Sequence, residues 1–225
     1  MCYYYSLAED AIKLQKRFKA KILEEEKYVP FEKVSAFEDK EVPVVVKAES
    51  NIIQFFKWGL IPSWTPSLTA QKKMGAHNAN ARAETIFEKK SFSKIILSRR
   101  CLVPATGFYE WQHLWNEKIP YLIKLKDEEI FGLGGVWDQW VNAETGEIFN
   151  TFTIITTIAN PLLEVIHNTK KRMPLIIDKK DEDMWLDHSL TREQIKPLLK
   201  PYPDDKMEAI QLRNDAIGIQ GFESL

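Results

Sequence analysis

Short apolar runs separated by turn signals make up most of the first two thirds of the chain. Residues 2–5 predict a short strand, and Thr145-Gly146 is a hairpin-turn signal between two longer runs. The runs that predict the longer strands are VPVVV (42–46), IIQFFKWGLIP (52–62), CLVPATGFYEW (101–111), YLIKL (121–125), IFGLGGVW (130–137) and EIFNTFTIITT (147–157).

Helical periodicity is confined to a few segments. Near the start, apolar residues recur at spacings of three and four, which predicts an amphipathic helix from Leu7 to Ile22. Ser6-x-x-Glu9 just before it has the pattern of a capping box. Three later segments also look helical: 160–166, 181–186 and 191–200.

Many strands with few helices between them favour an α+β fold with a mainly antiparallel sheet over a doubly wound parallel one. We find no internal repeat, low-complexity tract or linker in the 225 residues. We therefore predict a single domain, residues 1–225, with a barrel-like sheet core and flanking helices.

The charge balance limits the partners. The net charge is −1, so no overall field attracts nucleic acid or an anionic membrane, and any anion-binding face must be local. No apolar run approaches the roughly 18 residues of a membrane span, and no secretory leader is evident. Two cysteines make no disulfide framework, so we expect a cytoplasmic protein.

Cys2 is the first candidate for chemistry. Removal of Met1 would leave an α-amine and a thiol on adjacent carbons, and both titrate near pH 8. An aldehyde can form an imine with such an amine, and the thiol can then close a thiazolidine ring. Alternatively the thiolate alone attacks an acyl carbon, or Cys2 is only a small apolar residue of an edge strand.

Two further stretches place polar groups in patterns suited to a site. In HNANARAE (77–84), an extended chain would put Asn78, Asn80, Arg82 and Glu84 on one face, where the guanidinium could hold a phosphate; the alternative is an Ala-rich helix start. In GFYEW (107–111), Glu110 lies among aromatic residues. Apolar neighbours should raise its pKa towards neutrality, unless it reaches solvent at a strand end.

A third stretch, VIHNTKKRMP (165–174), combines an imidazole with positive charge. His167 is suited to proton transfer at neutral pH, although a single histidine is often structural. Lys170, Lys171 and Arg172 could hold phosphates. In KWGLIPSW (57–64) an exposed tryptophan could stack on a base, whereas we expect Trp58 to be core. No metal-ligand spacing, phosphate loop or dinucleotide motif is present, so we expect no metal and no cofactor.

In this order, the motifs resemble the SOS response associated peptidase (SRAP) family, the abasic-site-processing proteins. The resemblance runs from Cys2 through WGLIPSW, NARAET (80–85), RRCLVPATGFYEW (99–111) and FTIITTIAN (152–160) to the His…RMP segment. It covers most of the chain up to about Leu186.

The resemblance implies a protein that binds single-stranded DNA and joins its N-terminal cysteine to the ring-opened sugar of an abasic site. The product is a thiazolidine crosslink that shields the lesion, and Met1 is removed first, with autocatalysis implied by the family name. A minor lyase activity on the same imine is compatible with this. From the sequence itself we expect a monomer that uses no cofactor and does not enter a membrane. We expect it to be cytoplasmic, and nucleoid-associated when bound to DNA.

The resemblance also assigns roles residue by residue. Cys2 would be the nucleophile, Asn80 would orient the sugar and the N-terminus, Glu110 would handle protons, and His167 would assist opening of the deoxyribose. The implied DNA-contacting residues are Arg82, Trp64, Thr156 and Arg172.

Two departures concern the DNA contacts. Tyr3 and Tyr4 stand where the family usually has Gly and Arg, so a phosphate contact is lost, and Tyr4 could stack on a base instead. Four residues separate His167 from Arg172, where the family often has one. This longer loop adds Lys170 and Lys171, which could replace the lost charge.

Two other functions are compatible with the same residues. One is a cysteine peptidase with Cys2 as nucleophile and His167 as base. The other is a DNA-binding module without catalysis, which the near-neutral net charge disfavours.

Overall fold

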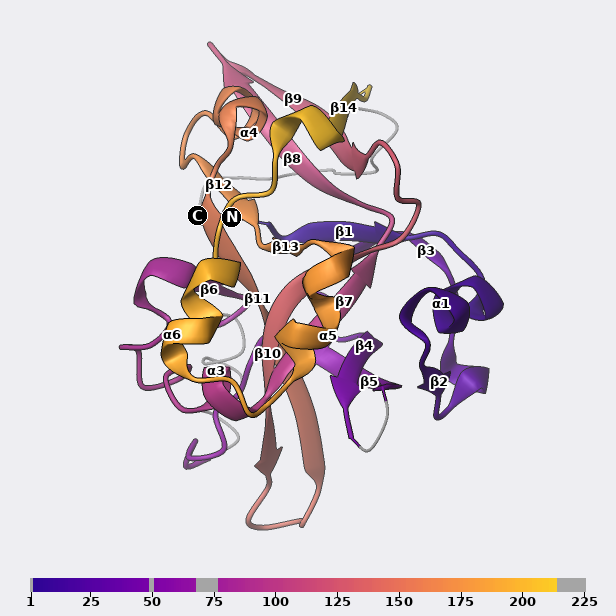
Figure 1. Cartoon of the computed structure of the whole chain (residues 1–225), viewed down its shortest axis with the longest axis vertical. Helices are drawn as coiled ribbons and strands as arrows, with labels where there is room; N and C mark the ends of the chain where they lie inside the picture. The colour runs from indigo at the N-terminus through magenta and orange to yellow at the C-terminus, as the bar shows by residue number, and fades with distance from the viewer. Residues whose placement is uncertain (1, 49–50, 68–76, 214–225) are drawn as a thin grey trace.

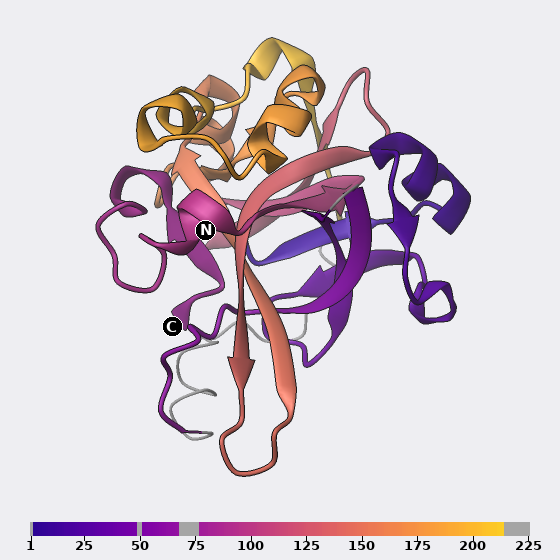
Figure 2. The same ribbon diagram turned by 60° about the horizontal axis from the view of Figure 1, so that its bottom comes forward.

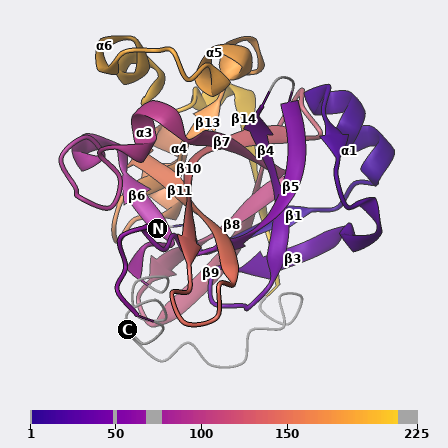
Figure 3. The same cartoon turned by 90° about the horizontal axis from the view of Figure 1, so that it is seen from below.

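The computed structural model describes residues 2–48, 51–67 and 77–213. Its core is a closed five-stranded barrel, seen end-on in Figure 3. Neighbouring strands are antiparallel except at the closing pair, where Thr151 and Phe152 lie parallel to Lys57 and Trp58. Going round the barrel, the strands are β11 (Ile148–Ile158), β10 (Phe131–Val141), β7 (Arg100–Ala105), β4 (Glu41–Lys47) and β5 (Asn51–Trp58).

A second, five-stranded antiparallel sheet packs beside the barrel and holds the start of the chain (Figure 1). Its strand β1 lies in the interior of the sheet and pairs on both sides, with Tyr5 opposite Val34 and opposite Phe108. The strand that directly follows Cys2 and Tyr3 thus lies inside the sheet rather than at an edge. In spatial order the strands are β14 (Met207–Gln211), β9 (Glu117–Leu125), β8 (Gly107–Leu114), β1 (Tyr4–Leu7) and β3 (Phe31–Ser35).

Short strands extend the barrel sheet at its margins. Two of them add to β11, one to β10 and one to β5. They are β12 (Arg172–Pro174) and β6 (Asn80–Arg82) on β11, β13 (Ile176–Ile177) on β10, and β2 (Lys21–Ile22) on β5.

The helices lie outside the sheets. In Figure 2 the helices of the C-terminal third gather on one side of the barrel, away from α1. The α-helices are α1 (Ala11–Phe18), α3 (Ile95–Ser98), α4 (Pro161–Ile166), α5 (Glu182–Leu186) and α6 (Arg192–Ile195). The 3-10 turns are η1 (Glu25–Lys27), η2 (Ala83–Thr85), η3 (Lys179–Asp181), η4 (Lys196–Leu198) and η5 (Asp204–Lys206).

The predicted fold class is confirmed: α+β, one domain, with an antiparallel barrel-like core and flanking helices. The hairpin signal is confirmed too, because β10 and β11 pair antiparallel and Gly146 takes a positive φ of 73° in their loop. Trp58 is core, at 6% exposure. The predicted domain bounds 1–225 include residues 1 and 214–225, which lie outside the described residues.

The predicted first helix is wrong at both ends. Ser6 and Leu7 belong to β1, where pairing with β3 and β8 outweighs the local capping pattern. The helix starts later, because the side chain of Asp10 accepts from Lys13 N (2.8 Å), and it ends where Lys19 turns left-handed (φ 48°). Ile22 continues into β2.

The single strand predicted over 101–111 is two strands. The chain turns at Thr106, whose backbone amide donates to Ser6 O (2.7 Å) and whose hydroxyl accepts from Ala8 N (3.1 Å). The part before the turn is in the barrel and the part after it is in the second sheet. This turn sends Glu110 towards the N-terminus. The pattern also missed β3 and β14, both mixed in polarity.

Candidate functional site

Cys2 lies buried just before β1, with no exposed surface. Its carbonyl accepts a hydrogen bond from Asn80 Nδ2 (2.9 Å), and its thiol is 3.6 Å from Tyr4 O. Burial, reinforced by the nearby Glu110 carboxyl, raises the pKa of the Cys2 thiol well above its usual range. The thiol is therefore held neutral beside a fixed main chain.

Asn80 is brought to this point by the parallel pairing of β6 with β11, in which Asn80 lies opposite Ile154 and Arg82 opposite Thr156. Residues two apart on a strand share a side, so Asn80 and Arg82 lie along one edge while Ala81 is buried between them. The face predicted to hold Asn78, Asn80, Arg82 and Glu84 is shorter than expected, because β6 spans only Asn80–Arg82. Glu84 lies beyond the strand, in η2, and faces Arg172.

Glu110 is on β8, opposite Tyr121, and only 3% of it is exposed. Burial raises the pKa of its carboxyl to about 7, as its aromatic neighbours predicted. The side chains alternate along β8 as expected, since the next residue back, Tyr109, points the other way and donates to Glu32 O (2.7 Å). Glu110 is thus a buried carboxyl that changes charge near neutral pH.

His167 follows α4, which Asn160 caps by accepting from Leu163 N (2.9 Å). Its Nδ1 lies 2.8 Å from Arg172 O and 3.4 Å from Glu110 Oε2. A carbonyl only accepts, so Nδ1 carries the proton and Nε2 keeps its lone pair. Burial lowers the pKa of His167 to about 4, so at neutral pH the contact with Glu110 is not an ion pair.

Arg172 is almost buried, and its guanidinium is engaged inside the protein. It makes a bidentate pair with Glu84 (2.6 and 3.0 Å) and donates to Thr156 O (2.6 Å) and Thr156 Oγ1 (3.2 Å). This pair lowers the pKa of Glu84 although burial opposes it. Arg172 therefore ties the end of β11 to η2 and, through its carbonyl, orients His167.

Three buried polar atoms around this cluster have no hydrogen-bond partner among the described residues. They are Asn80 Oδ1, Glu110 Oε1 and Arg172 Nε. Buried polar atoms in native proteins are nearly always paired, so a cluster of unpaired ones indicates where the polar groups of a ligand bind. The amide of Asn80 thus binds the main chain of Cys2, and the carboxyl of Glu110 lies near Cys2 and in contact with the imidazole of His167.

The predicted DNA-contacting residues are spread around this cluster. Arg82, Lys170 and Lys171 are exposed, and Trp64 is 46% exposed with Lys90 Nζ 4.2 Å from its ring centroid. Tyr4 is buried instead, with its ring edge-on to Trp111 at 5.3 Å. Stacking of Tyr4 and phosphate contact by Arg172 remain predictions.

Asn168, which the sequence did not single out, joins the loop of His167 to the strand of Glu110. His113 N donates to Asn168 Oδ1 (3.1 Å), and Asn168 Nδ2 donates to His113 O (2.7 Å). A second bond, from Gln112 Nε2 to Val165 O (3.1 Å), lies beside it. The side chain of Asn168 thus pairs with β8 as a strand residue would.

We expect Asn168→Ala to raise the pKa of His167 from about 4 towards its ordinary value, because a loosened loop lets water reach the imidazole. NMR titration of the histidine ring protons measures this. Asn150→Ala is the control, since it removes one exposed bond to Gln139 on the β10–β11 hairpin. An unchanged His167 midpoint in Asn168→Ala would show that the loop is held without this side chain.

Other kinds of site find no support in the part of the chain that the structure describes. No group of three or more His, Cys, Asp or Glu side chains there could hold a metal ion. Cys2 and Cys101 are both buried free thiols. No helix among residues 2–48, 51–67 and 77–213 is long and apolar enough to cross a membrane.

The fold is a barrel beside a second sheet, and its candidate site consists of the buried Cys2, the nearby carboxyl of Glu110 and the imidazole of His167 in contact with that carboxyl. Comparison with known proteins gives the family. The model of the SOS response associated peptidase (SRAP) family matches residues 1–217. The chain belongs to this family, which confirms the resemblance.

Relatives and solved structures agree with this. The abasic site processing protein YoqW of Bacillus subtilis (strain 168) is 41% identical over 171 residues, 75% of this chain and 73% of YoqW. The abasic site processing protein HMCES of Gallus gallus is 33% identical over 184 residues, 72% of this chain and 53% of HMCES. A crystal structure from Bacteroides thetaiotaomicron has a TM-score of 0.90 at 40% identity, covering 97% of this chain and 95% of that one.

Proposed function

We propose that this protein processes abasic sites by forming a covalent thiazolidine crosslink between Cys2 and single-stranded DNA. The observation that carries the proposal is the fixed main chain of Cys2, held by Asn80 beside the buried carboxyl of Glu110. The names of its relatives, abasic site processing proteins, agree with it.

The chemistry starts with hydrolysis of the Met1–Cys2 peptide bond, which consumes one water and frees the Cys2 amine. The amine adds to the aldehyde carbon of the ring-opened sugar, and loss of one water gives an imine. The thiol sulfur then adds to the imine carbon while its proton goes to the nitrogen. The sum is one aldehyde and one aminothiol giving one thiazolidine and one water.

The residues of the site suit these steps. A carboxyl with a pKa near 7 can give a proton to the departing hydroxyl and take one from the thiol at the same pH. His167, whose imidazole is neutral at neutral pH, can accept the proton of the sugar hydroxyl as the ring opens. Asn80 keeps the nitrogen of Cys2 in place. Arg82, Lys170 and Lys171 offer charge for phosphates on the outside.

The same environment disfavours the alternative of a general cysteine peptidase. Such enzymes need a thiolate, whereas burial raises the pKa of the Cys2 thiol. Addition to an imine needs no preformed thiolate, because the carboxylate of Glu110 can take the proton during the attack. The peptidase step in this proposal is confined to removal of Met1.

The test is incubation of the purified protein with a single-stranded oligonucleotide that carries one abasic site, followed by a denaturing gel. Intact mass identifies the molecules that begin at Cys2. We expect a heat-stable shifted band, and no such band with an undamaged oligonucleotide. The mass of the adduct should be the sum of the masses of the protein and the oligonucleotide minus one water. Protein that begins at Cys2 yet gives no adduct would overturn the proposal.

A further inference from the structure

A groove of about 380 Å³ lies next to the candidate site, between the end of β11 and the α6–η4 segment. Several residues that line the groove are sequence neighbours of site residues. Thr157 and Ile158 come directly after Thr156, and Ala83 and Glu84 come directly after Arg82. Strand residues advance about 3.3 Å each, so the groove begins within roughly 10 Å of these residues.

The groove is strongly positive. Arg192, Lys196 and Lys200 line it, all exposed, and none of the three has an ion-pair partner among the described residues. The acidic residue that lines it is Glu84, which Arg172 already neutralises by a bidentate pair. In a chain of net charge −1, this is a local cation cluster that repels itself unless an anion binds.

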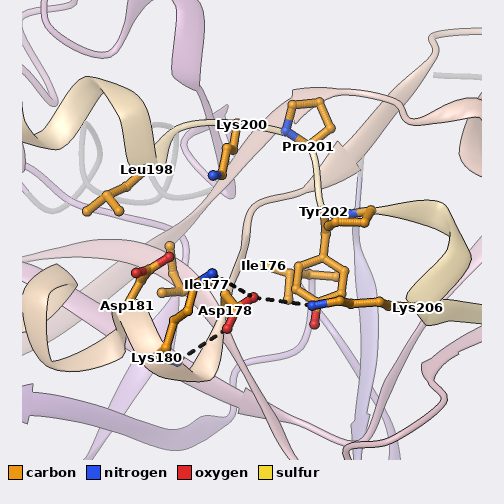
Figure 4. A pocket seen from close by; sticks show the side chains of 11 residues that line it. Ile176, Ile177, Asp178, Lys180, Asp181, Leu198, Lys200, Pro201, Tyr202 and Lys206 are labelled. Carbon is orange, nitrogen blue, oxygen red and sulfur yellow. Dashed lines mark hydrogen bonds and ion pairs between the residues drawn. The ribbon is translucent and has the colours of Figure 1, made fainter.

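A neighbouring cavity shows the contrast. It is smaller, about 160 Å³, and shares Lys200 and Pro201 with the groove (Figure 4). There Asp178 faces two cations, Lys206 at 3.5 Å and Lys180 at 4.0 Å, so the cavity's own acid offsets its charge. The charge of the groove has no such internal balance.

The remaining walls of the groove are apolar. Ile158 is 60% exposed, and Leu199 and Pro201, which also line the groove, are half-buried. The guanidinium of Arg192 lies 4.8 Å from the ring centroid of Phe87, which presents a flat cationic surface. Cations beside flat apolar surface suit a ligand with regularly spaced anions and sugar or base faces, which describes a nucleic-acid strand.

We infer that this groove, with Lys196 and Lys200 as its phosphate contacts and Arg192–Phe87 as a stacking surface, binds the single DNA strand on one side of the abasic nucleotide. The inference rests on the proposed function for the placement of the lesion at Cys2. Binding of phosphates by Lys196 and Lys200 does not depend on the proposed function, because it needs only the residues of the groove.

The first test measures binding of undamaged single-stranded DNA against salt, so it does not need crosslinking. We expect Lys196→Gln/Lys200→Gln to lower the slope of log K against log salt by about 1.4, since each single-strand phosphate contact contributes about 0.7. At 0.15 M salt this corresponds to about tenfold weaker binding. Lys16→Gln/Lys21→Gln is the control, because both lysines are exposed on α1 and β2, away from α6. An unchanged slope overturns the inference.

The second test uses abasic oligonucleotides extended on one side of the lesion only. The double variant should weaken binding of one series, 5′-extended or 3′-extended, and leave the other unchanged, because the groove lies on one side of the site. Equal weakening of both would mean a diffuse charge effect. A polyglutamate peptide that binds the groove as tightly as DNA would assign it to an acidic protein partner and overturn the choice of DNA.

Discussion

Cys2→Ser is expected to abolish the heat-stable adduct with abasic DNA while leaving an imine that borohydride can trap. Serine keeps the α-amine and the main chain that Asn80 holds, so the first addition still proceeds. Its hydroxyl is a far weaker nucleophile than a thiol, so ring closure fails and the imine hydrolyses on heating. The measurement is a denaturing gel of matched samples with and without borohydride, with intact mass to confirm removal of Met1.

Cys101→Ser is the matched control, because Cys101 is also a buried free thiol but lies in the barrel strand β7. We expect it to form the wild-type adduct, provided that thermal unfolding shows a folded protein. A heat-stable adduct in Cys2→Ser would rule out the thiazolidine. Loss of the borohydride-trapped species as well would point to an amine that never reached the sugar.

Glu110→Gln is expected to slow crosslinking by about 100-fold, because a positioned acid–base group contributes on the order of 10²–10⁴ to a rate. The glutamine fills the same volume but cannot exchange a proton. Since the pKa of Glu110 is raised to about 7, the plot of the wild-type crosslinking rate against pH should change slope near pH 7. The plot for the variant should lack this inflection. Single-turnover rates between pH 5 and 9 measure both effects.

The same substitution should stabilise the fold at high pH. The folded-state pKa of Glu110, about 7, lies above the ordinary value of 4.5, so its stability contribution is complete below pH 4.5 and is lost as pH rises through 7. At pH 8.5, Glu110→Gln should therefore raise the free energy of unfolding by on the order of 3 kcal/mol. At pH 5 the two proteins should be nearly equal. Urea unfolding at both pH values measures this.

His167 does not disturb this comparison, because both proteins contain it and its stability contribution changes in the opposite sense. Its folded-state pKa of about 4 lies below the ordinary 6.5, so that contribution is present above pH 6.5 and is lost as pH falls through 4. A variant that is less stable than wild type at pH 8.5 would show that the Glu110 carboxylate is solvated or paired in the folded state.

The sequence predicted the parts of the fold that depend on local pattern. The apolar runs predicted β4 and the β10–β11 hairpin, since an apolar run and a turn signal act locally. The first helix was misread because strand pairing over about a hundred residues, Ser6 with Gly107, decided the conformation of Ser6 and Leu7. Long-range pairing of this kind leaves no local pattern in one sequence.

The same division holds for the site. The aromatic neighbours of Glu110 predicted its raised pKa, because burial by adjacent residues is local. The contact between Glu110 and His167 depends on how α4 meets β8, and no spacing in the chain encodes it. The internal pairing of Arg172 with Glu84 likewise needed the structure. Asn168 was missed because a lone asparagine in a loop carries no signal.

The interior position of β1 bears on how a crosslinked molecule would be cleared from DNA. A terminal residue beside an edge strand can fray and be cut by a protease, but β1 is hydrogen-bonded on both sides, to β3 and to β8. Freeing it requires breaking its pairing with both neighbours, so the rate at which this part of the sheet unfolds governs cleavage near the DNA. Degradation of such an adduct therefore calls for a protease that unfolds its substrate by force, and the most durable remnant on the DNA is the folded domain itself.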